Sequence, residues 1–262
     1  MAKEPIRIVT RGDDLGSYRS ANRAILDACK KGVLRNTSVI VPAEHFEKAA
    51  EMFSNEKDIC VGLHACITCE WENVRWKPLL PADRVRCILE ADGTLNRSVN
   101  AIHDGGPRFS EIMAELQAQL DRARERKLDI RYVDAHMAFP WIFEESDEHR
   151  LRDEMVRWAE REGVIWSGWG DTLGLKHFEH KESGDDTITA LADAIRSAEG
   201  GNYLIVSHPA YNDDEMQPAR YDDAKPGQIA QERDLQRRMF MDPLILEAYK
   251  DAGAIPIRYD EV

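Results

Sequence analysis

The stretch that decides the fold reads Ile6-Arg7-Ile8-Val9-Thr10-Arg11-Gly12-Asp13-Asp14-Leu15-Gly16. Its first five residues form a β-branched run that is typical of a short strand. Two adjacent carboxylates follow at once, and like charges side by side repel each other unless a cation lies between them. A carboxylate before glycine is also common in turns and at helix starts, so the pair alone is compatible with a purely structural role.

Histidine ends three further apolar runs in the same way. A lone histidine at such a position is also a common hydrogen-bonded core or surface residue, so each run is a weak signal by itself. Because all of these clusters fall at predicted strand ends, together they indicate a metal-dependent hydrolase. The three runs are Val61-Gly62-Leu63-His64, Tyr132-Val133-Asp134-Ala135-His136 and Ile205-Val206-Ser207-His208-Pro209.

Short β-branched runs alternate with amphipathic segments along the chain, which is the pattern of repeated βαβ units and a parallel sheet. The sequence therefore predicts an α/β fold, a distorted (β/α) barrel of about seven parallel strands that resembles a TIM barrel. In such barrels the chemistry gathers at the carboxyl ends of the strands. The predicted strands are Ile6–Thr10, Thr37–Val41, Ile59–Leu63, Tyr132–Asp134, Val164–Trp166, Tyr203–Ser207 and Ile255–Tyr259.

The predicted helices have recognisable ends. Ser20 is placed to cap a helix over Ala21–Lys31, and Gly32 is placed to supply a left-handed residue after it. Further helices are predicted from Phe109 to about Lys127, from Ser146 to Glu162 before Gly163, over Gln228–Met241, and over Pro243–Ala252 with proline in the first turn.

Three long irregular segments interrupt this pattern, between His64 and Ser110, over Ser167–Asp186, and from His208 to Gly227. Loops of such length in a compact domain usually form lids or binding loops. No internal repeat or linker is apparent, so a single domain over residues 1–262 is expected.

The 262 residues carry a formal net charge of -13, with 48 acidic and 35 basic side chains. This balance argues against sequence-independent binding to nucleic acid and against binding to an anionic membrane surface. No apolar run is long enough to span a bilayer or to act as a signal peptide. The five cysteines are expected to be reduced thiols, and a cytoplasmic location is expected.

One aspartate and two histidines would leave coordination positions open, as catalytic metal sites do. The donor set fits Zn²⁺, and with bound waters it fits Mg²⁺, whereas nickel, cobalt, manganese and iron are further candidates. Asp134 lies two residues before His136 and is expected to orient its imidazole. A rival zinc site of His64 with Cys66 and Cys69 rests on a single C-x-x-C and is the weaker hypothesis.

Aromatic residues lie just beyond the candidate ligands. Their rings are expected to stack on a sugar, although they fit equally well as core residues beneath a loop. Arg75 lies among them and could bind hydroxyl groups. The aromatic residues are Trp71, Trp76, Phe139 and Trp141, and no role is assigned to His177 or His180.

The ordered set Asp-Asp-Leu-Gly, Gly-Leu-His, Asp-Ala-His-Met and His-Pro resembles the YdjC-like carbohydrate deacetylases. Two further segments support this resemblance, and it extends from about Ile6 to Tyr259. They are Glu70-Trp71-Glu72-Asn73-Val74-Arg75-Trp76-Lys77-Pro78-Leu79 and Gln231-Glu232-Arg233-Asp234-Leu235.

The resemblance implies removal of the acetyl group from an N-acetylated mono- or oligosaccharide by a protein that can form a homodimer. Asp14, His64 and His136 would hold the metal, and Arg233 would orient a carboxylate at the substrate site. Asp13 would act as general base and His208 as general acid. The alternative is a metal-dependent sugar isomerase or epimerase, which would release no acetate, and a sugar-binding protein without catalysis is a third possibility.

Overall fold

The computed structural model describes residues 4–142, 148–168, 170–178, 184 and 186–262. Within these residues the chain forms one sheet, and every recorded strand pair in it is parallel. The strands are β1 (Ile6–Leu15), β2 (Asn36–Val39), β3 (Cys60–Ala65), β4 (Ile130–Ala135), β5 (Ile165–Trp166), β6 (Lys176–His177), β7 (Gly201–Ser207) and β8 (Ile255–Ile257).

The sheet follows the order β5-β4-β3-β2-β1-β7-β6, and β8 adds to the first half of β1. The seven-strand path curls without closing, because the two-residue strands β5 and β6 are its ends and do not pair with each other in the part of the chain described. The predicted distorted (β/α) barrel of about seven parallel strands is confirmed. The additional strand β6 was not predicted from the sequence.

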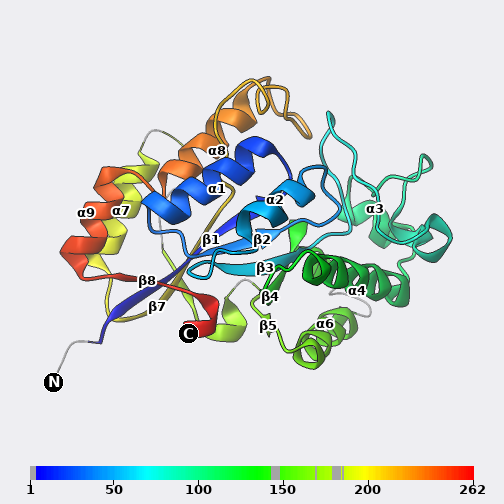
Figure 1. The fold of residues 1–262 in the computed structure, drawn as a ribbon, viewed down its shortest axis with the longest axis horizontal. Coiled ribbons are helices and arrows are strands. Elements are labelled where there is room, and N and C mark those ends of the chain that lie inside the picture. Colours follow the sequence, from blue (N-terminus) through cyan, green and yellow to red (C-terminus); the bar gives the residue numbers. More distant parts are fainter. Residues whose placement is uncertain (1–3, 143–147, 169, 179–183, 185) are drawn as a thin grey trace.

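Helices surround the curled sheet (Figure 1). Helices α1, α2 and α8 lie along one flank, α4 and α6 along another, and α7 packs beside α9. Their bounds are α1 (Arg19–Lys31), α2 (Phe46–Phe53), α3 (Val99–Asp104), α4 (Phe109–Glu125), α5 (Phe139–Ile142), α6 (Glu148–Glu162), α7 (Thr187–Ser197), α8 (Gln228–Arg238) and α9 (Pro243–Ala252).

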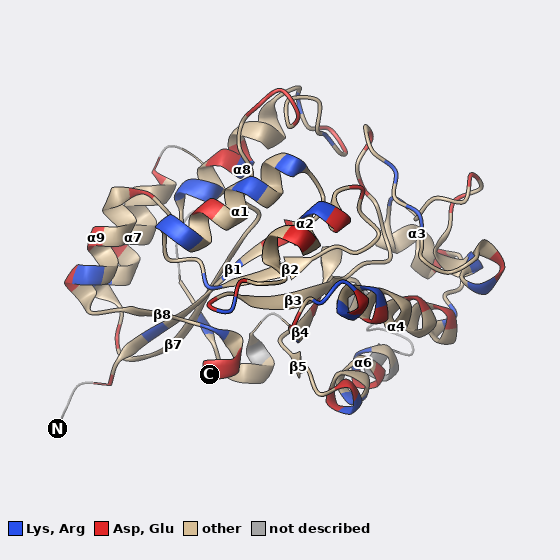
Figure 2. Cartoon of the chain, viewed as in Figure 1, with Lys and Arg blue, Asp and Glu red and all other residues tan. Residues whose placement is uncertain are grey.

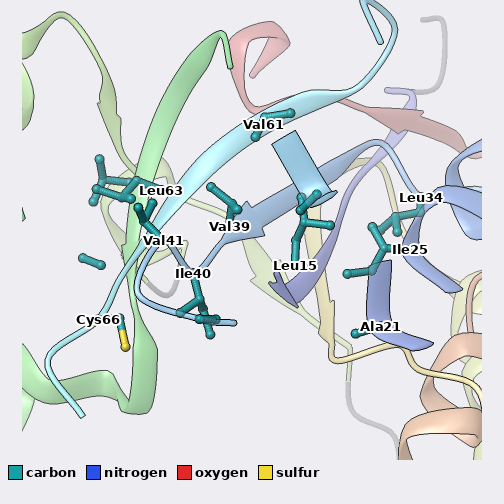
Figure 3. Close-up of a cluster of buried hydrophobic side chains, with 14 of the residues drawn as sticks. Leu15, Ala21, Ile25, Leu34, Val39, Ile40, Val41, Val61, Leu63 and Cys66 are labelled. Atoms are coloured by element: carbon teal, nitrogen blue, oxygen red, sulfur yellow. The ribbon is translucent and has the colours of Figure 1, made fainter. Parts of the chain in front are cut away.

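The core lies between the sheet and these helices. Leu15 of β1, Ile25 of α1 and Val39 of β2 belong to one buried apolar cluster (Figure 3). Charged side chains gather on the helices and loops, whereas the strands carry few of them (Figure 2). Arg11, Asp13, Asp14 and Asp134 break this rule, because each is buried and at most 4% exposed. A buried charge costs free energy unless it has a partner, so a cluster of buried charges is more typical of a functional site than of a packed core.

Two predicted helix ends were wrong. Ser20 lies inside α1, and the backbone N–H groups of Arg19 and Ser20 donate instead to the Glu215 carboxylate from a distant loop. Gly32 has φ -129°, which is not left-handed. A Cβ atom there would lie 2.1 Å from the carbonyl oxygen of Phe240, so glycine is required by the close approach of two backbones.

The long segment between His64 and Ser110 is an ordered insert with its own short elements. It contains α3 and two 3-10 turns, Ala82–Arg84 and Arg86–Ile88, and Thr68 pairs with Asn96 in a β-bridge. Helices α2 and α7 were also missed, although their buried residues recur at helical spacing, as Phe46, Ala49, Ala50 and Phe53 do in α2. None of the described helices combines the length and apolarity needed to cross a bilayer.

Candidate metal centre

Asp14, His64 and His136 come together at the carboxyl ends of β1, β3 and β4, and β2 lies between β1 and β3 in the sheet. Asp14 lies near the end of β1, His64 lies in β3, and His136 directly follows β4. Parallel strands place these ends at one edge of the sheet, which is why residues far apart in the sequence become neighbours. All three residues are buried.

The three side chains present one atom each to a common centre. Nε2 of His64 and Nδ1 of His136 both lie 3.6 Å from Oδ1 of Asp14, and the two nitrogens are 3.3 Å apart. A cation bound tetrahedrally at ~2.1 Å from each donor would separate the donors by ~3.4 Å. Oδ1 of Asp14 is buried and has no hydrogen-bond partner. The donor types, their spacing and this unsatisfied oxygen all fit a divalent cation.

Asp134 sets the orientation of His64. Nδ1 of His64 lies 2.6 Å from one oxygen of Asp134, and the other oxygen accepts from Ser38 and pairs with Arg11. Because Nδ1 is hydrogen-bonded to Asp134, Nε2 is the nitrogen that faces Asp14. Burial by itself would lower the pKa of His64, but the neighbouring carboxylates, Asp134 foremost, raise it to about 9.

His136 is held by Glu70 and not by Asp134, which corrects the prediction. Nε2 of His136 lies 2.9 Å from Oε2 of Glu70. The prediction assumed that Asp134 and His136 share one extended strand, but β4 ends at Ala135 and His136 begins a 3-10 turn. Asp134 instead pairs in register with His64 on the adjacent strand.

The backbone at Asp14 is unusual for a residue other than glycine. Its φ is 65°, in the left-handed region, and its carbonyl oxygen accepts bonds from the backbone N–H and hydroxyl of Ser17. Such strain is often found where a side chain must be aimed. Nη1 of Arg233 lies 3.0 Å from Oδ2 of Asp14. Burial opposes ionisation of Asp14, but Arg233 and the two histidines outweigh it and lower the pKa of its carboxyl.

Asp13 lies in a second cluster of potential metal ligands, with His64 and Asp134. The Arg11 guanidinium holds it with two nitrogens, at 2.9 and 3.1 Å from its two oxygens. Arg11 also contacts the hydroxyl of Tyr259 and the carbonyl oxygen of Gly168. Burial raises the pKa of Asp13, and Arg11 offsets only part of this rise.

His208 follows β7 and is half-buried. It lines a small cavity together with Asp14, Trp71 and Arg233, so it shares the site with the metal-ligand candidates. Its backbone N–H donates a 2.8 Å hydrogen bond to the side chain of Gln236 in α8. The cavity therefore brings together residues that the sequence predicted as metal ligand and as acid/base group.

Three of the predicted sugar-stacking rings are almost fully buried, which corrects that expectation, although Trp71 lines the small cavity beside Asp14. Trp71, Trp76 and Phe139 are at most 2% exposed. Trp71 packs edge-on against Tyr18 and Tyr221 at 5.4 Å, beneath the loops that cover the site. The alternative role, as core residues under a loop, accounts for these contacts. Trp141 lies in α5, and its side chain is outside the described part of the structure.

Arg75 fixes the insert and is not open to a sugar hydroxyl. Its guanidinium donates to the hydroxyl of Thr94 at 2.9 Å and to the carbonyl oxygens of Cys69 and Leu95. It also lies 3.3 Å from the carboxylate of Glu90. The four contacts tie the start of the insert, at Cys69, to its residues 90–95, which explains this arginine without assigning it to substrate binding.

The rival zinc site with Cys66 and Cys69 does not form. The clusters of potential metal ligands found among the described residues contain no cysteine. Burial raises the pKa of Cys69 to about 11 and that of Cys66 further, so both are thiols at neutral pH. His177 lies in the exposed strand β6, and His180 falls outside the described residues.

Two residues of the site were not assigned from the sequence. Glu70 stands next to Trp71 in a segment that the resemblance drew attention to, but nothing in its spacing indicates contact with His136. Arg11 precedes the aspartate pair by two residues, and an alternation of side chains along β1 could have placed it beside Asp13.

Comparison with known proteins gives a consistent set of relatives. The model of the family described as YdjC-like protein matches residues 7–251. Proteins named carbohydrate deacetylase match from Geobacillus stearothermophilus, at 25% identity over 98% of both chains, and from Thermoanaerobacter pseudethanolicus, at 21% identity over 96% of this chain and 97% of that protein. A third, from Brevibacillus brevis, is 25% identical over 80% of this chain and 83% of that protein.

The fold is also similar to a solved structure. The crystal structure of a protein from Enterococcus faecalis V583, named as a candidate for cellobiose-phosphate cleavage, superposes with a TM-score of 0.76. The alignment covers 98% of both chains at 18% sequence identity, a level at which the likeness establishes the fold.

Proposed function

The chain belongs to the YdjC-like protein family, and from that premise we propose that it is a metal-dependent hydrolase that removes the acetyl group from an N-acetylated sugar. Relatives named carbohydrate deacetylase that align with nearly the whole chain support the reaction class. The observation that carries the proposal is the triangle of donor atoms from Asp14, His64 and His136, with sides of 3.3 to 3.6 Å.

These three residues would hold one divalent cation, most readily Zn²⁺ or Mg²⁺. When bound, such an ion polarises an acyl carbonyl and makes a water molecule easier to deprotonate. Arg233 would keep the second oxygen of Asp14 turned away from the centre, because it pairs with Oδ2 and leaves Oδ1 free.

Asp13 is the proposed general base. Its carboxylate shares a cluster with His64 and Asp134 whose donor atoms lie within 4.8 Å of one another, which supports a role close to the proposed cation. Burial raises the pKa of Asp13, which makes the carboxylate a stronger base. The two bonds from Arg11 would fix its orientation during proton transfer.

His208 is the proposed general acid. It lines the same cavity as Asp14 and Arg233, which supports a role beside the proposed cation. Imidazole is the side chain best suited to donate a proton near neutral pH. Protonation of the departing amine would prevent collapse back to the amide.

Acetate release tests the proposal. Purified protein is stripped with a chelator, reloaded separately with Zn²⁺, Mg²⁺, Co²⁺, Mn²⁺ or Ni²⁺, and incubated with N-acetylglucosamine and its β-1,4-linked disaccharide. We expect acetate and free amine in equal amounts with at least one ion, and neither after chelation. A rearranged sugar without acetate would favour the isomerase alternative, and binding without turnover under every ion would favour a sugar-binding protein.

A further inference from the structure

Glu70 brings a third carboxylate into contact with the proposed ligand set. Its side chain is 7% exposed, and Oε2 lies 2.9 Å from Nε2 of His136. The opposite ring nitrogen, Nδ1, is the one that faces Asp14 and His64. Burying a carboxylate costs free energy unless a partner compensates for its lost hydration. The contact of Glu70 with Nε2 of His136 is therefore expected to have a function.

The two histidines are held in opposite ways. Asp134 contacts Nδ1 of His64 and leaves Nε2 for the centre, whereas Glu70 contacts Nε2 of His136 and leaves Nδ1. We propose that Glu70 is a positioning residue that keeps the proton of His136 on Nε2 and thereby makes Nδ1 the metal-binding atom. This inference rests on the proposed metal-dependent function.

The backbone around Glu70 is fixed on both sides. The N–H of Cys69 donates to the carbonyl oxygen of Asn96 at 2.8 Å, and the N–H of Glu72 donates to that of Arg220 at 3.0 Å. Glu70 therefore stands on a short stretch tied both to Asn96 within the insert and to the loop that follows β7. That rigidity suits a residue whose task is to aim an imidazole.

The negative charge of Glu70 adds to its geometric effect. A carboxylate that accepts the N–H of a ligating histidine raises the basicity of the opposite nitrogen and restricts rotation of the ring. Glutamine could still accept the hydrogen bond through its amide oxygen but would carry no charge. The two substitutions Glu70→Gln and Glu70→Ala therefore separate loss of charge from loss of the contact.

Cobalt binding measured by isothermal titration calorimetry tests the inference. We expect Glu70→Ala to weaken Co²⁺ affinity by about 10- to 100-fold and Glu70→Gln to weaken it less. Glu72→Gln is the matched control, because Glu72 is two residues away, pairs with the exposed Arg220, and should leave the affinity unchanged. Far-UV circular dichroism of each metal-free variant verifies the fold.

The position of the histidine protons gives a second readout. In Zn²⁺-loaded protein labelled with ¹⁵N-histidine, NMR should find the proton of His136 on Nε2 and that of His64 on Nδ1. A proton on Nδ1 of His136, or a folded Glu70→Ala variant with wild-type Co²⁺ affinity, overturns the role of Glu70 alone. Failure of the wild-type protein to bind Co²⁺ overturns both this role and the proposed metal-dependent function.

Discussion

Nδ1 of His64 donates its proton to Asp134 across a distance of 2.6 Å, and the two residues are directly paired between β3 and β4. The register of a parallel sheet therefore fixes which nitrogen of His64 faces the candidate centre. Asp134 is in turn held by Ser38 and Arg11, so the orientation of one imidazole depends on contacts from β1, β2 and β4. This chain of contacts is expected to support metal binding by His64.

Substitution of Asp134 should weaken the metal site. In Asp134→Asn the charge that stabilises the Nδ1 proton is lost, and we expect Co²⁺ affinity to fall by about 10- to 100-fold. Calorimetric titration of the metal-free protein measures the change. Asp129→Asn is the control, because Asp129 lies just before the same strand but is exposed. Unchanged affinity in Asp134→Asn would show that the contact does not support the ligand.

Metal affinity should rise with pH. The carboxylates around His64, chiefly Asp134, overcome burial and raise its pKa to about 9, so in the metal-free protein Nε2 carries a proton at neutral pH. A cation must displace that proton, and below pH 9 the affinity should increase by about tenfold per pH unit. Mn²⁺ titrations followed by electron paramagnetic resonance between pH 6.5 and 8.5 measure this slope.

The raised pKa of His64 also makes the stability of the metal-free protein depend on pH. This stability falls as the pH rises, whereas the metal affinity increases. A pKa raised from 6.5 to about 9 stabilises the fold fully below pH 6.5, and this stabilisation is lost as the pH rises to about 9. The increase in Tm caused by Mn²⁺ should therefore grow across this window. An increase that stays constant or shrinks would contradict the protonation of His64.

Asp13→Asn should separate catalysis from metal binding. Asparagine keeps the size of the side chain but cannot accept a proton, and we expect turnover to fall by about 100-fold or more. Asp13 is not one of the three proposed ligands, so the metal content should stay near that of the wild-type protein. Turnover close to the wild-type value would rule out Asp13 as the general base.

Arg11 should matter more for stability than any surface arginine. It is buried between Asp13 and Asp134, and its removal leaves two buried carboxylates without their cation. We expect Arg11→Ala to destabilise the protein by about 3–5 kcal/mol in urea unfolding. Arg23→Ala is the control, because its ion pair with Asp213 is largely exposed and should cost no more than about 1 kcal/mol. Equal effects of the two substitutions would contradict this interpretation.

The parallel sheet and its functional edge could be predicted because each signal is local. A β-branched run followed by Asp13-Asp14, or by His64, indicates both a strand and the end where chemistry gathers. The ends of α9 were also predictable from neighbouring residues, because Pro243 lies in its first turn and Gly253, at φ 62°, directly follows it. These features can be predicted without knowing which distant segments they contact in the fold.

The missed features depend on contacts between distant segments. Glu70 meets His136 across 66 residues, and Glu215 meets the start of α1 across almost 200. Gly32 resembled a left-handed helix end in sequence, but its backbone contact with Phe240 is what requires glycine. Asp134 was expected to contact the imidazole of His136, but it contacts that of His64, with which it is paired on the adjacent strand.

The most direct test of the account is a crystal soaked in Mn²⁺ or Zn²⁺ and measured at the absorption edge of the ion. The account predicts one strong anomalous peak at ~2.0–2.2 Å from Oδ1 of Asp14, Nε2 of His64 and Nδ1 of His136. The peak should vanish in Asp14→Ala. No peak at these three atoms in soaked wild-type crystals, or a peak that persists without Asp14, would contradict the claim that they share one cation.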